Sequence, residues 1–543
     1  MKILISQINP IVGDLKYNSE LIIKSIDHGE KLGADLVLFP ELALTGYPPQ
    51  DLLWQQEFIQ AVEAKLEQIA ATVKEMTVVI GFPRACPKSP RKLFNSAAII
   101  EKGKIIGYAD KVLLPTYDVF NEQRYFNSGK SSHVWTIKGK KVAILICEDI
   151  WQHSYPETFS NYHRDPVLEL KTSSPDIVLN LSASPYFSQK PLHRQTVCLK
   201  VAKTLNCPVI LCNQVGANDS LIFDGNSLYV GPKGLIKCAA AFKEEHLLID
   251  LEKQEANSKK EELAEKELYE ALVLGVRDYF LKQGLKTACL GLSGGVDSAL
   301  VATIASEALG PQNVTALFMP SRFSSFQSAR DAKLLAANLK MPFKIIEIEE
   351  AFHSFSLFLT SQLDQPLLEV TTENLQARIR ALLLMAFSNN SGALLLATGN
   401  KSELSMGYAT LYGDMCGALG VIGDLTKSQV VAIAKWINRA KEIIPWYTIE
   451  RPPSAELKEN QKDSDVLPDY KLLDAILTFY MEKNCSAQTI ANMLGISQVE
   501  VEQIILRIHQ TEYKRRQAPP ALKVSAKAFT IGRHFPIVQR WSY

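Results

Sequence analysis

Residues 290–301 read LGLSGGVDSALV, and this stretch decides the fold of the second half of the chain. An apolar strand enters a glycine-rich turn, and an apolar helix leaves it. This is the layout of a phosphate-binding loop, but the lysine of the common motif G-x-x-x-x-G-K-[ST] is absent. Asp297 lies near the turn instead. Because an acid repels a bare phosphate, we expect Asp297 to hold Mg²⁺ that bridges to the phosphates.

The other residues of the turn suit the same ligand. Glycines let the backbone approach an anion, and the hydroxyls of Ser293 and Ser298 can donate to it together with the helix N-terminus. The loop therefore predicts a site for magnesium pyrophosphate, the group released when ATP is cleaved between its α and β phosphorus atoms. On spacing alone, a helix-capping turn with incidental glycines remains an alternative.

The pattern around this loop predicts an α/β chain. Strand candidates at 287–293, 313–320, 343–349 and 393–400 alternate with helical stretches, which is typical of a doubly wound parallel sheet. Residues 1–250 also alternate short apolar strands with helical segments such as 18–32 and 57–73, and form a separate α/β domain. Between the two, we expect a charged linker over 251–269 that runs into a helix from about Glu261, followed by a second domain over 270–543.

Composition excludes several classes of protein. In 543 residues, 59 Lys and Arg balance 58 Asp and Glu, so the sequence gives no sign of a nucleic acid or a membrane as partner. No apolar run of about 18 residues occurs, and the nine cysteines are scattered without a C-x-x-C pair. These features predict a cytoplasmic protein with free thiols. His153 and His163 lack zinc-ligand spacing.

Two further stretches turn the loop into a family resemblance. With SGGVDS, the segments TTENLQARIRALLL (371–384) and ATGNKSELSMGYATLYGDMCG (397–417) resemble the signatures of NAD synthetases. The resemblance implies a Rossmann-like sheet of the adenine nucleotide alpha hydrolase type. It also implies a reaction in which ATP adenylates the nicotinate carboxylate of deamido-NAD⁺ and pyrophosphate leaves. Ammonia then attacks the acyl-adenylate to give NAD⁺ and AMP.

The same resemblance assigns residues to this reaction. Mg²⁺ would be held by Asp297 and Glu403, and ATP is the co-substrate. Deamido-NAD⁺ would meet Asn374, Arg378, Glu403 and Lys514, with Asp414 a weaker candidate. Arg378 follows Asn374 by four residues, so both lie on one helix face. ATP would be bound by Gly291, Leu292, Ser293, Gly294, Gly295, Val296, Asp297, Ser298 and Thr398.

Three stretches of the N-terminal domain carry a second resemblance. FPELALTGYPP (39–49), DKVLLPTYDVFNEQRYF (110–126) and ILICEDIW (144–151) resemble, in this order, the carbon–nitrogen hydrolases of the nitrilase superfamily. The implied fold is a nitrilase-like α/β sandwich, and the implied activity is hydrolysis of glutamine. Cys147, at the end of a strand, would be the nucleophile, Glu41 the base and Lys111 the oxyanion donor. Glu122 would be a second acid that supports them.

Recognition of glutamine is carried over in the same way. The matching positions are Tyr117, Ser184 and Lys190, with Tyr47 as a further lining residue. Ser182 competes with Ser184, and spacing does not decide between them. The stretch 151–176 is longer than we expect for the family and is read as a local insertion at the mouth of the glutaminase site.

Together the two resemblances cover nearly the whole chain and predict a glutamine-dependent NAD synthetase, with an internal ammonia channel and a homo-oligomeric state. One alternative is amidation of another carboxylate by the same chemistry. A second is a DNA-binding regulator, because residues 486–508 read as a helix-turn-helix with Gly495 in the turn. Near-zero net charge and two glutamates in the second helix argue against DNA binding.

Overall fold

The computed structural model describes residues 1–86, 92–154, 162–253 and 263–541. The chain divides into two compact units, Met1–Glu261 and Glu262–Tyr543. Within the expected linker, residues 254–262 lie outside the described ranges, as do 155–161 of the expected insertion. The helix expected from about Glu261 begins at Ala264.

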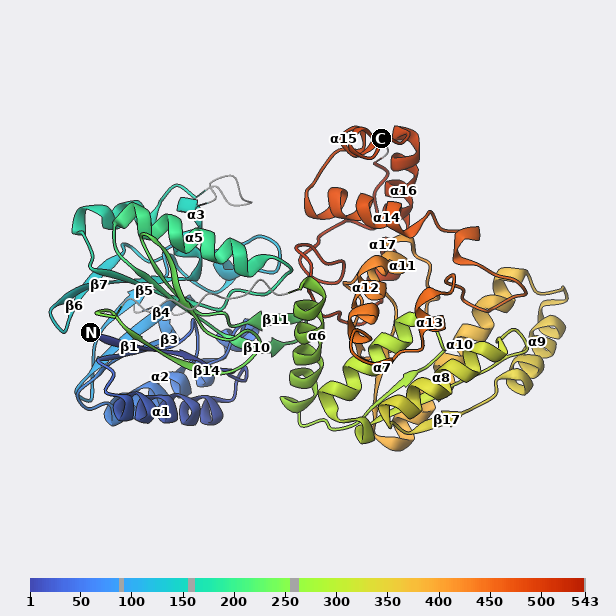
Figure 1. Cartoon of the computed structure of the whole chain (residues 1–543), viewed down its shortest axis with the longest axis horizontal. Helices are drawn as coiled ribbons and strands as arrows, with labels where there is room; N and C mark the ends of the chain where they lie inside the picture. The colour runs from blue at the N-terminus through green and yellow to red at the C-terminus, as the bar shows by residue number, and fades with distance from the viewer. Residues whose placement is uncertain (87–91, 155–161, 254–262, 542–543) are drawn as a thin grey trace. The chain divides into compact units, whose positions relative to one another are not determined.

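The N-terminal unit is a sandwich of two six-stranded sheets and a short two-stranded ribbon (Figure 1). In each six-stranded sheet, three parallel strands are flanked by antiparallel ones. The first sheet has the order β14 (Glu245–Asp250), β1 (Lys2–Gln7), β2 (Leu36–Leu38), β3 (Thr77–Ala85), β4 (Leu93–Glu101), β5 (Lys104–Asp110). The second has the order β13 (Gly234–Cys238), β12 (Leu228–Gly231), β9 (Val209–Asn213), β8 (Ile177–Ser182), β7 (Lys140–Ile146), β6 (His133–Ile137). The ribbon is β10 (Val215–Asn218) and β11 (Leu221–Asp224).

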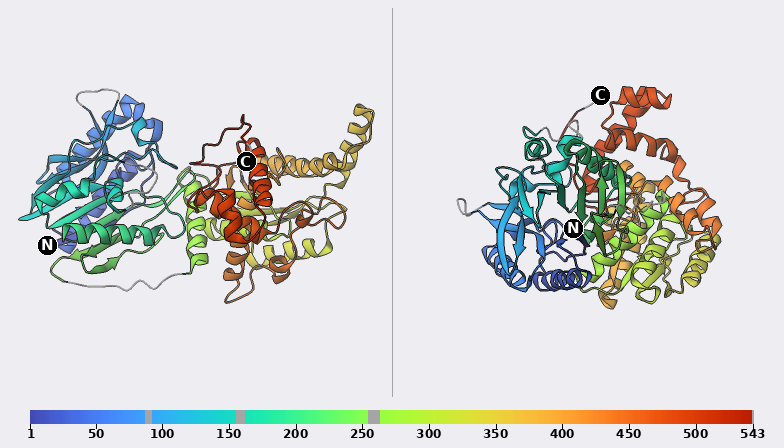
Figure 2. Two further views of the ribbon diagram at one scale, coloured as in Figure 1. Left: turned by 90° about the horizontal axis from the view of Figure 1, so that it is seen from above. Right: turned by 60° about the vertical axis from the view of Figure 1, so that its left-hand side comes forward.

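Apolar residues fill three layers of this unit. Ile3 and Ile5 of β1 belong to the cluster between the sheets, whereas Leu4 faces helices on the outside, as strand alternation requires. Helices α1 (Leu15–Leu32) and α2 (Gln56–Thr72) cover the first sheet, and α5 (Lys190–Leu205) covers the second (Figures 1 and 2). The short helices α3 (Trp151–Ser154) and α4 (Pro166–Leu170) lie beside α5. The α/β sandwich predicted for this half is confirmed.

The C-terminal unit contains a five-stranded parallel sheet, which confirms the predicted doubly wound architecture. The order along the chain reverses between β15 and β18, and ligands of such sheets bind at this switch point. The strands lie in the order β17 (Phe343–Ile345), β16 (Val314–Phe318), β15 (Ala288–Gly291), β18 (Leu394–Ala397), β19 (Leu419–Gly420). Its helices are α6 (Ala264–Leu281), α7 (Val296–Leu309), α8 (Phe326–Leu339), α9 (Glu349–Leu363), α10 (Glu369–Ser391), α11 (Lys401–Met406), α12 (Lys427–Ile437) and α13 (Trp446–Glu450).

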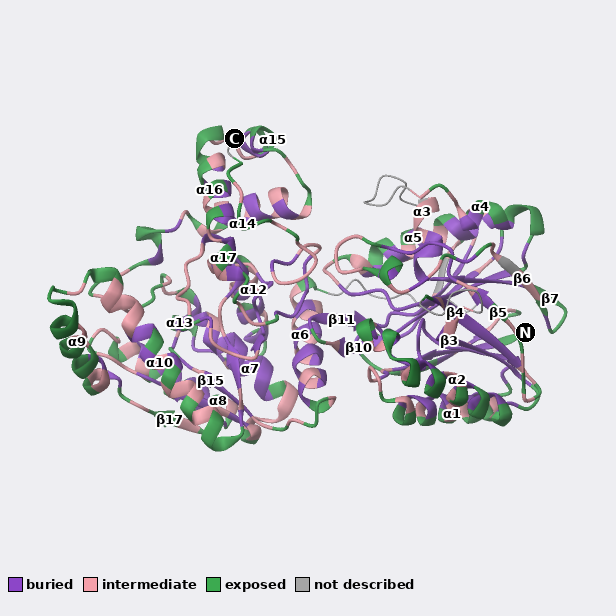
Figure 3. Cartoon of the chain, turned by 180° about the vertical axis from the view of Figure 1, so that it is seen from behind, coloured by how far each residue is buried: buried purple, intermediate pink, exposed green. Residues whose placement is uncertain are grey.

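The end of the chain forms a small helical layer. Its helices are α14 (Tyr470–Leu477), α15 (Ala487–Leu494), α16 (Gln498–Gln510) and α17 (Glu512–Arg515). Gly495 ends α15 at φ 67°, and α16 begins three residues later, so two helices follow one another over the stretch 486–508. Buried residues of α16 pack into one apolar cluster with those of α14. Elsewhere in the unit, α9 is largely exposed, whereas the strands of the sheet are largely buried (Figure 3). Across the described residues, none of the helices combines the length and apolarity needed to cross a bilayer.

One wrongly predicted strand end bears on the chemistry. We expected Cys147 at the end of a strand, but β7 ends at Ile146. Cys147 therefore does not end a strand: it begins a 3₁₀ turn over Cys147–Ile150 with φ 43°, a left-handed value that an apolar pattern does not reveal. Asp149 accepts a hydrogen bond from the Ile146 amide at 2.9 Å and closes this turn.

Two candidate active sites

The first candidate site is a set of buried charges at the ends of strands in the N-terminal unit. The Lys111 ammonium lies 2.6 Å from Glu41 Oε1 and 2.8 Å from Glu122 Oε1. Asn95 also donates to Glu41 Oε1 at 2.7 Å, and the Ala183 amide donates to Glu41 Oε2 at 3.1 Å. The three predicted residues are thus brought together, and the Glu41 carboxylate is fixed by donors from three other segments.

Burial dominates the electrostatics of this cluster. It raises the pKa of Glu122 to about 7, although Lys111 opposes the shift. For Lys111 itself, burial alone would lower the pKa, but Glu122 and Glu41 outweigh it and raise the pKa well above its usual value. Lys111 is therefore a permanent cation in a site that contains two carboxylates.

Cys147 belongs to the same electrostatic cluster. The residue is 5% exposed, and its backbone has a left-handed φ of 43°. Burial and the Glu41 carboxylate raise the pKa of the thiol well above its usual value, while Lys111 acts in the opposite direction. The thiol is therefore protonated near neutral pH, and its use as a nucleophile requires a base such as Glu41.

Beside the thiol lies a carboxylate that the sequence reasoning missed. Glu148 accepts hydrogen bonds from the hydroxyls of Tyr117, at 3.0 and 3.1 Å, and Tyr162, at 3.1 Å. Burial raises the pKa of Glu148, and Lys111, Tyr117 and Lys190 oppose this. The Lys190 ammonium lies 3.7 Å from the centre of the Trp151 ring. Adjacency to Cys147 in the motif ICED was the signal that could have identified Glu148.

The two competing serines have different environments. The Ser182 hydroxyl donates to Asn180 Oδ1 at 2.7 Å, and the residue ends β8. Ser184 follows the strand, is 3% exposed, and is fixed through its amide, which donates to Asn213 Oδ1 at 2.9 Å. Tyr47, the further predicted lining residue, donates to Glu122 Oε1 at 2.9 Å.

The second candidate site is the SGGVDS loop, which follows β15 and opens α7. Gly294 has φ 82°, and a Cβ there would lie 2.5 Å from the Ser328 carbonyl oxygen, so only glycine fits. The hydroxyls of Ser293 and Ser298 lie 3.2 Å apart, and Ser298 also donates to the Gly295 carbonyl at 3.0 Å. The loop is thus closed on itself, and its glycines bring the backbone to the mouth of a cavity.

This cavity has a volume of about 290 Å³. Of the predicted ATP-binding residues, all but Gly294 line it, including Thr398. Glu403 and Asp414 also line it. Residues outside the prediction complete the wall, among them Arg380, Lys427, Arg451, Ser454 and Glu456.

Lys427 lies between the two carboxylates predicted to hold metal. Its ammonium forms an ion pair with Asp297 and lies 3.5 Å from Glu403 Oε1. Burial raises the pKa of Glu403 to about 8, the Asp297 charge adds to this, and Lys427 opposes it. For Lys427, burial would lower the pKa, but Asp297 and Glu403 outweigh it and raise the value. Two acidic side chains therefore share one buried ammonium at this point of the cavity wall.

Such a pair of carboxylates fits Mg²⁺, which commonly uses one or two carboxylates and completes its shell with substrate phosphates and water. The part of the chain that the structure describes brings no three His, Cys, Asp or Glu side chains together in a metal-binding group. Asn400 fixes the pair, because its amide donates to Asp297 Oδ1 at 2.9 Å.

Three predicted substrate residues do not line the cavity but meet at an adjacent loop. Asn374 accepts a hydrogen bond from the Thr410 hydroxyl at 2.7 Å, and Arg378 donates to the Leu411 carbonyl at 3.2 Å. Lys514 donates to the carbonyls of Gly407 and Ala409 at 2.8 and 2.7 Å. This loop, 407–411, leads directly to Asp414 in the cavity wall, so α10 and α17 hold one rim of the site.

Comparison with known proteins identifies the family of each unit. The model of the carbon-nitrogen hydrolase family matches residues 2–256, and that of NAD synthase matches residues 268–518. A glutamine-dependent NAD(+) synthetase of Synechocystis sp. is 43% identical over 99% of this chain and 98% of its own. One of Acinetobacter baylyi is 39% identical with the same coverage.

Solved structures with a similar fold belong to the same family of enzymes. The glutamine-dependent NAD⁺ synthetase of Acinetobacter baumannii, solved in complex with ADP, is 36% identical, with a TM-score of 0.77 over 100% of this chain and 99% of its own. That from Cytophaga hutchinsonii, 20% identical with a TM-score of 0.85 over 99% and 98% of the two chains, shares the fold. The chain therefore belongs to the glutamine-dependent NAD(+) synthetases, with a carbon–nitrogen hydrolase unit followed by a NAD synthase unit.

Proposed function

We propose that the chain converts deamido-NAD⁺ to NAD⁺ with ATP and glutamine, forming AMP, diphosphate and glutamate. The observation that carries this proposal is the presence of two separate chemical sites in one chain. One is a thiol beside a buried carboxylate and ammonium. The other is a lysine-free phosphate loop beside two carboxylates.

In the first half-reaction, Cys147 attacks the carboxamide carbon of glutamine and its proton passes to Glu41. The oxyanion that develops is stabilised by the Lys111 ammonium, which Glu122 holds in place. Glu41 returns the proton to the leaving nitrogen, so ammonia departs and a glutamyl thioester remains. Water, deprotonated by Glu41, then releases glutamate and restores the thiol.

We assign the recognition of glutamine to three polar side chains, those of Tyr117, Ser184 and Lys190. Ser184 is preferred over Ser182 because the Ser182 hydroxyl already donates to Asn180. Glu148, with Lys190 nearby, makes the pocket suited to an α-amino acid that carries both charges.

In the second half-reaction, a carboxylate oxygen of deamido-NAD⁺ attacks the α-phosphorus of ATP and pyrophosphate leaves. Residues 291–298 and Thr398 are assigned to ATP, and the loop would hold the departing pyrophosphate through the start of α7. Asp297 and Glu403 would hold Mg²⁺, which neutralises charge on the phosphates. Asn374, Arg378, Glu403 and Lys514 are assigned to deamido-NAD⁺. Ammonia then replaces AMP at the acyl carbon.

We also propose a homo-oligomer. Helix α9 exposes Phe355, Leu357, Phe358 and Leu363, and the start of α10 exposes Leu368. A run of exposed apolar side chains on neighbouring helices suits a contact with a second copy. Light scattering that gives the mass of a single chain at working concentration would contradict this. The cysteines of the described residues are present as thiols, so we further propose a reducing compartment such as the cytoplasm.

A pair of variants tests the division of labour between the two sites. Cys147→Ala is expected to abolish NAD⁺ formation from glutamine and to retain formation from ammonium. Asp297→Asn is expected to lose both, while glutamine is still hydrolysed to glutamate. Wild type that forms no NAD⁺ from either nitrogen source would overturn the proposal.

A further inference from the structure

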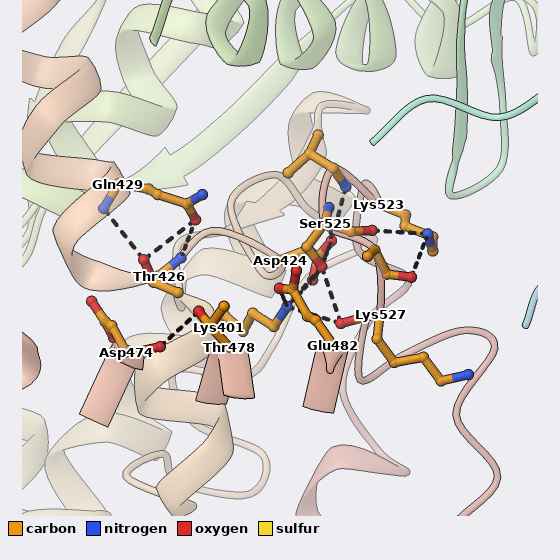
Figure 4. A network of polar contacts seen from close by, with 12 residues as sticks. Lys401, Asp424, Thr426, Gln429, Asp474, Thr478, Glu482, Lys523, Ser525 and Lys527 are labelled. Atoms are coloured by element: carbon orange, nitrogen blue, oxygen red, sulfur yellow. Dashed lines mark hydrogen bonds and ion pairs between the residues drawn. The ribbon is translucent and has the colours of Figure 1, made fainter. Parts of the chain in front are cut away.

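A buried cluster of charges surrounds the start of α11, and its members do not line the synthetase cavity (Figure 4). Its centre is Lys401, the first residue of α11, whose side chain is 1% exposed. The ammonium lies 3.0 Å from Asp424 Oδ1 and donates to Ser525 Oγ at 2.7 Å and to the Lys527 carbonyl at 2.9 Å. Glu482 is a fourth partner at 3.4 Å. A buried ammonium requires such partners, and they restrict its position.

Asp424 binds the C-terminal segment from the other side. Its Oδ2 accepts the amides of Val524 at 2.8 Å and Ser525 at 2.7 Å. The Ser525 hydroxyl donates to the same carboxylate at 2.8 Å. Asp424 follows β19, so the segment is held against the sheet of the synthetase unit. The segment 521–529 lies beyond residue 518, where the match to the NAD synthase family model ends.

The backbone makes this attachment closer still. The Gly420 amide donates to the Pro520 carbonyl at 2.8 Å, and Gly420 forms an isolated bridge with Ala521. A Cβ at Gly423 would lie 2.8 Å from the Ala521 Cβ, so a larger residue there would push the segment away. The C-terminal segment therefore continues the edge of the sheet.

The same turns of helix carry the cavity residues. Asn400, next to Lys401, donates to Asp297, and its Oδ1 accepts the Glu403 amide at 3.0 Å. The Lys401 amide donates to the Leu425 carbonyl at 2.8 Å, and the Lys427 amide donates to Ser402 Oγ at 2.9 Å. The starts of α11 and α12 are thus joined to each other, with Glu403 and Lys427 on the cavity side.

We propose that Lys401, Asp424 and Ser525 are positioning residues of the synthetase reaction. They tie segment 521–529 to the starts of α11 and α12, and so fix Asp297, Glu403 and Lys427 before the nucleotide binds. The inference rests on the proposed function for the roles of Asp297 and Glu403. Misplacement of reacting groups by about 1 Å can lower rates on the order of 10²-fold. Weaker contacts between segment 521–529 and the starts of α11 and α12 should therefore lower kcat more than they raise the KM.

Ser525→Ala tests this with little change in volume and no unpaired buried charge. We expect about a tenfold lower kcat with ammonium, a KM for deamido-NAD⁺ within twofold of wild type, and a higher Mg²⁺ concentration for half-maximal rate. Ser525→Thr, which keeps the hydroxyl, should restore the rate. The matched control is Ser388→Ala, which removes the bond from Ser388 Oγ to the Ala393 carbonyl at the end of α10 and should leave all three values unchanged.

A second readout uses no substrate. In the ligand-free chain, Ser525→Ala should raise hydrogen–deuterium exchange at residues 400–407 and 424–430, but not at β16. Wild-type exchange and wild-type kcat in Ser525→Ala would overturn the proposal. So would a rise in exchange throughout the unit that Ser388→Ala reproduces. If wild type forms no NAD⁺, the proposed function fails, whereas the exchange measurement still decides whether Ser525 holds α11 and α12.

Discussion

The two candidate active sites of this chain accommodate buried charge in different ways. In the glutaminase site, Lys111 pairs directly with Glu41 and Glu122, and Asn95 and a backbone amide complete the bonding of Glu41. In the synthetase site, Asp297 and Glu403 face a cavity of about 290 Å³ with Lys427 between them. In the first site, the charged side chains compensate one another's charge directly. In the second, the Lys427 ammonium compensates the charge of the two carboxylates until substrates bind.

This difference follows from the chemistry that each site performs. Hydrolysis through a thiol needs only a nucleophile, a base and an oxyanion donor, and all of these are side chains. Transfer of the adenylyl group from ATP to a carboxylate brings several negative phosphate oxygens into the site, so fixed positive charge and a metal must be available. The glutaminase site should therefore depend on single side chains, and the synthetase site on the balance of charge among several.

The largest effect that we expect comes from Glu41→Gln, which removes the proposed base and leaves the shape of the side chain nearly unchanged. General base catalysis contributes about 10²–10⁴-fold, so glutamine-dependent NAD⁺ formation and glutamate release should fall by about 10³-fold. The rate with ammonium should stay within twofold. Glu57→Gln, an exposed position of the same unit, is the control. Substantial glutamine use by Glu41→Gln would show that another group takes the thiol proton.

A smaller loss is expected for Lys427→Met, because the synthetase site shares its charge among several groups. Without the ammonium, Asp297 and Glu403 lose the cation that lies between them, and kcat should fall by about 10–100-fold with either nitrogen source. Glutamate release should be retained. Lys435→Met removes an exposed lysine from the same helix and should have no effect. If Lys427→Met lost only the glutamine-dependent rate, the assignment of this lysine to the synthetase site would be wrong.

The sequence revealed the two sites unequally. Glu41, Lys111, Glu122 and Cys147 lie in extended motifs, and the structure places all four in one buried cluster. The SGGVDS loop could also be recognised from the sequence, because glycines and a strand-to-helix transition are local features. The sequence did not reveal Lys427 as the partner of Asp297, because the two residues are 130 positions apart.

Two physical reasons explain the misses. Contacts between distant segments depend on tertiary packing, so GDLTKSQV gave no sign that its lysine meets SGGVDS. The left-handed backbone of Cys147 interrupts a run of strand-forming residues, and apolar periodicity carries no information on φ. Likewise, the cluster of Lys401 joins residues that are each ordinary in the sequence, and it becomes visible only where α11, β19 and segment 521–529 come together.

The smallest effect concerns stability and tests whether the synthetase site is strained without ligand. Glu403 has a folded pKa of about 8, raised from 4.5 chiefly by burial. Between these two values the unfolded chain releases a proton that the folded chain keeps, so the contribution of Glu403 to stability falls as pH rises from 4.5 to about 8. Glu403→Gln cannot ionise and escapes this loss. Its Tm without ligand should therefore exceed that of wild type at pH 8 by about 2–4 °C, and match it near pH 5.

Glu500→Gln, at an exposed position, should follow wild type at both pH values. A difference in Tm between Glu403→Gln and wild type that does not change with pH would mean that Lys427 keeps Glu403 ionised throughout, and the synthetase site would then be as fully paired as the glutaminase site.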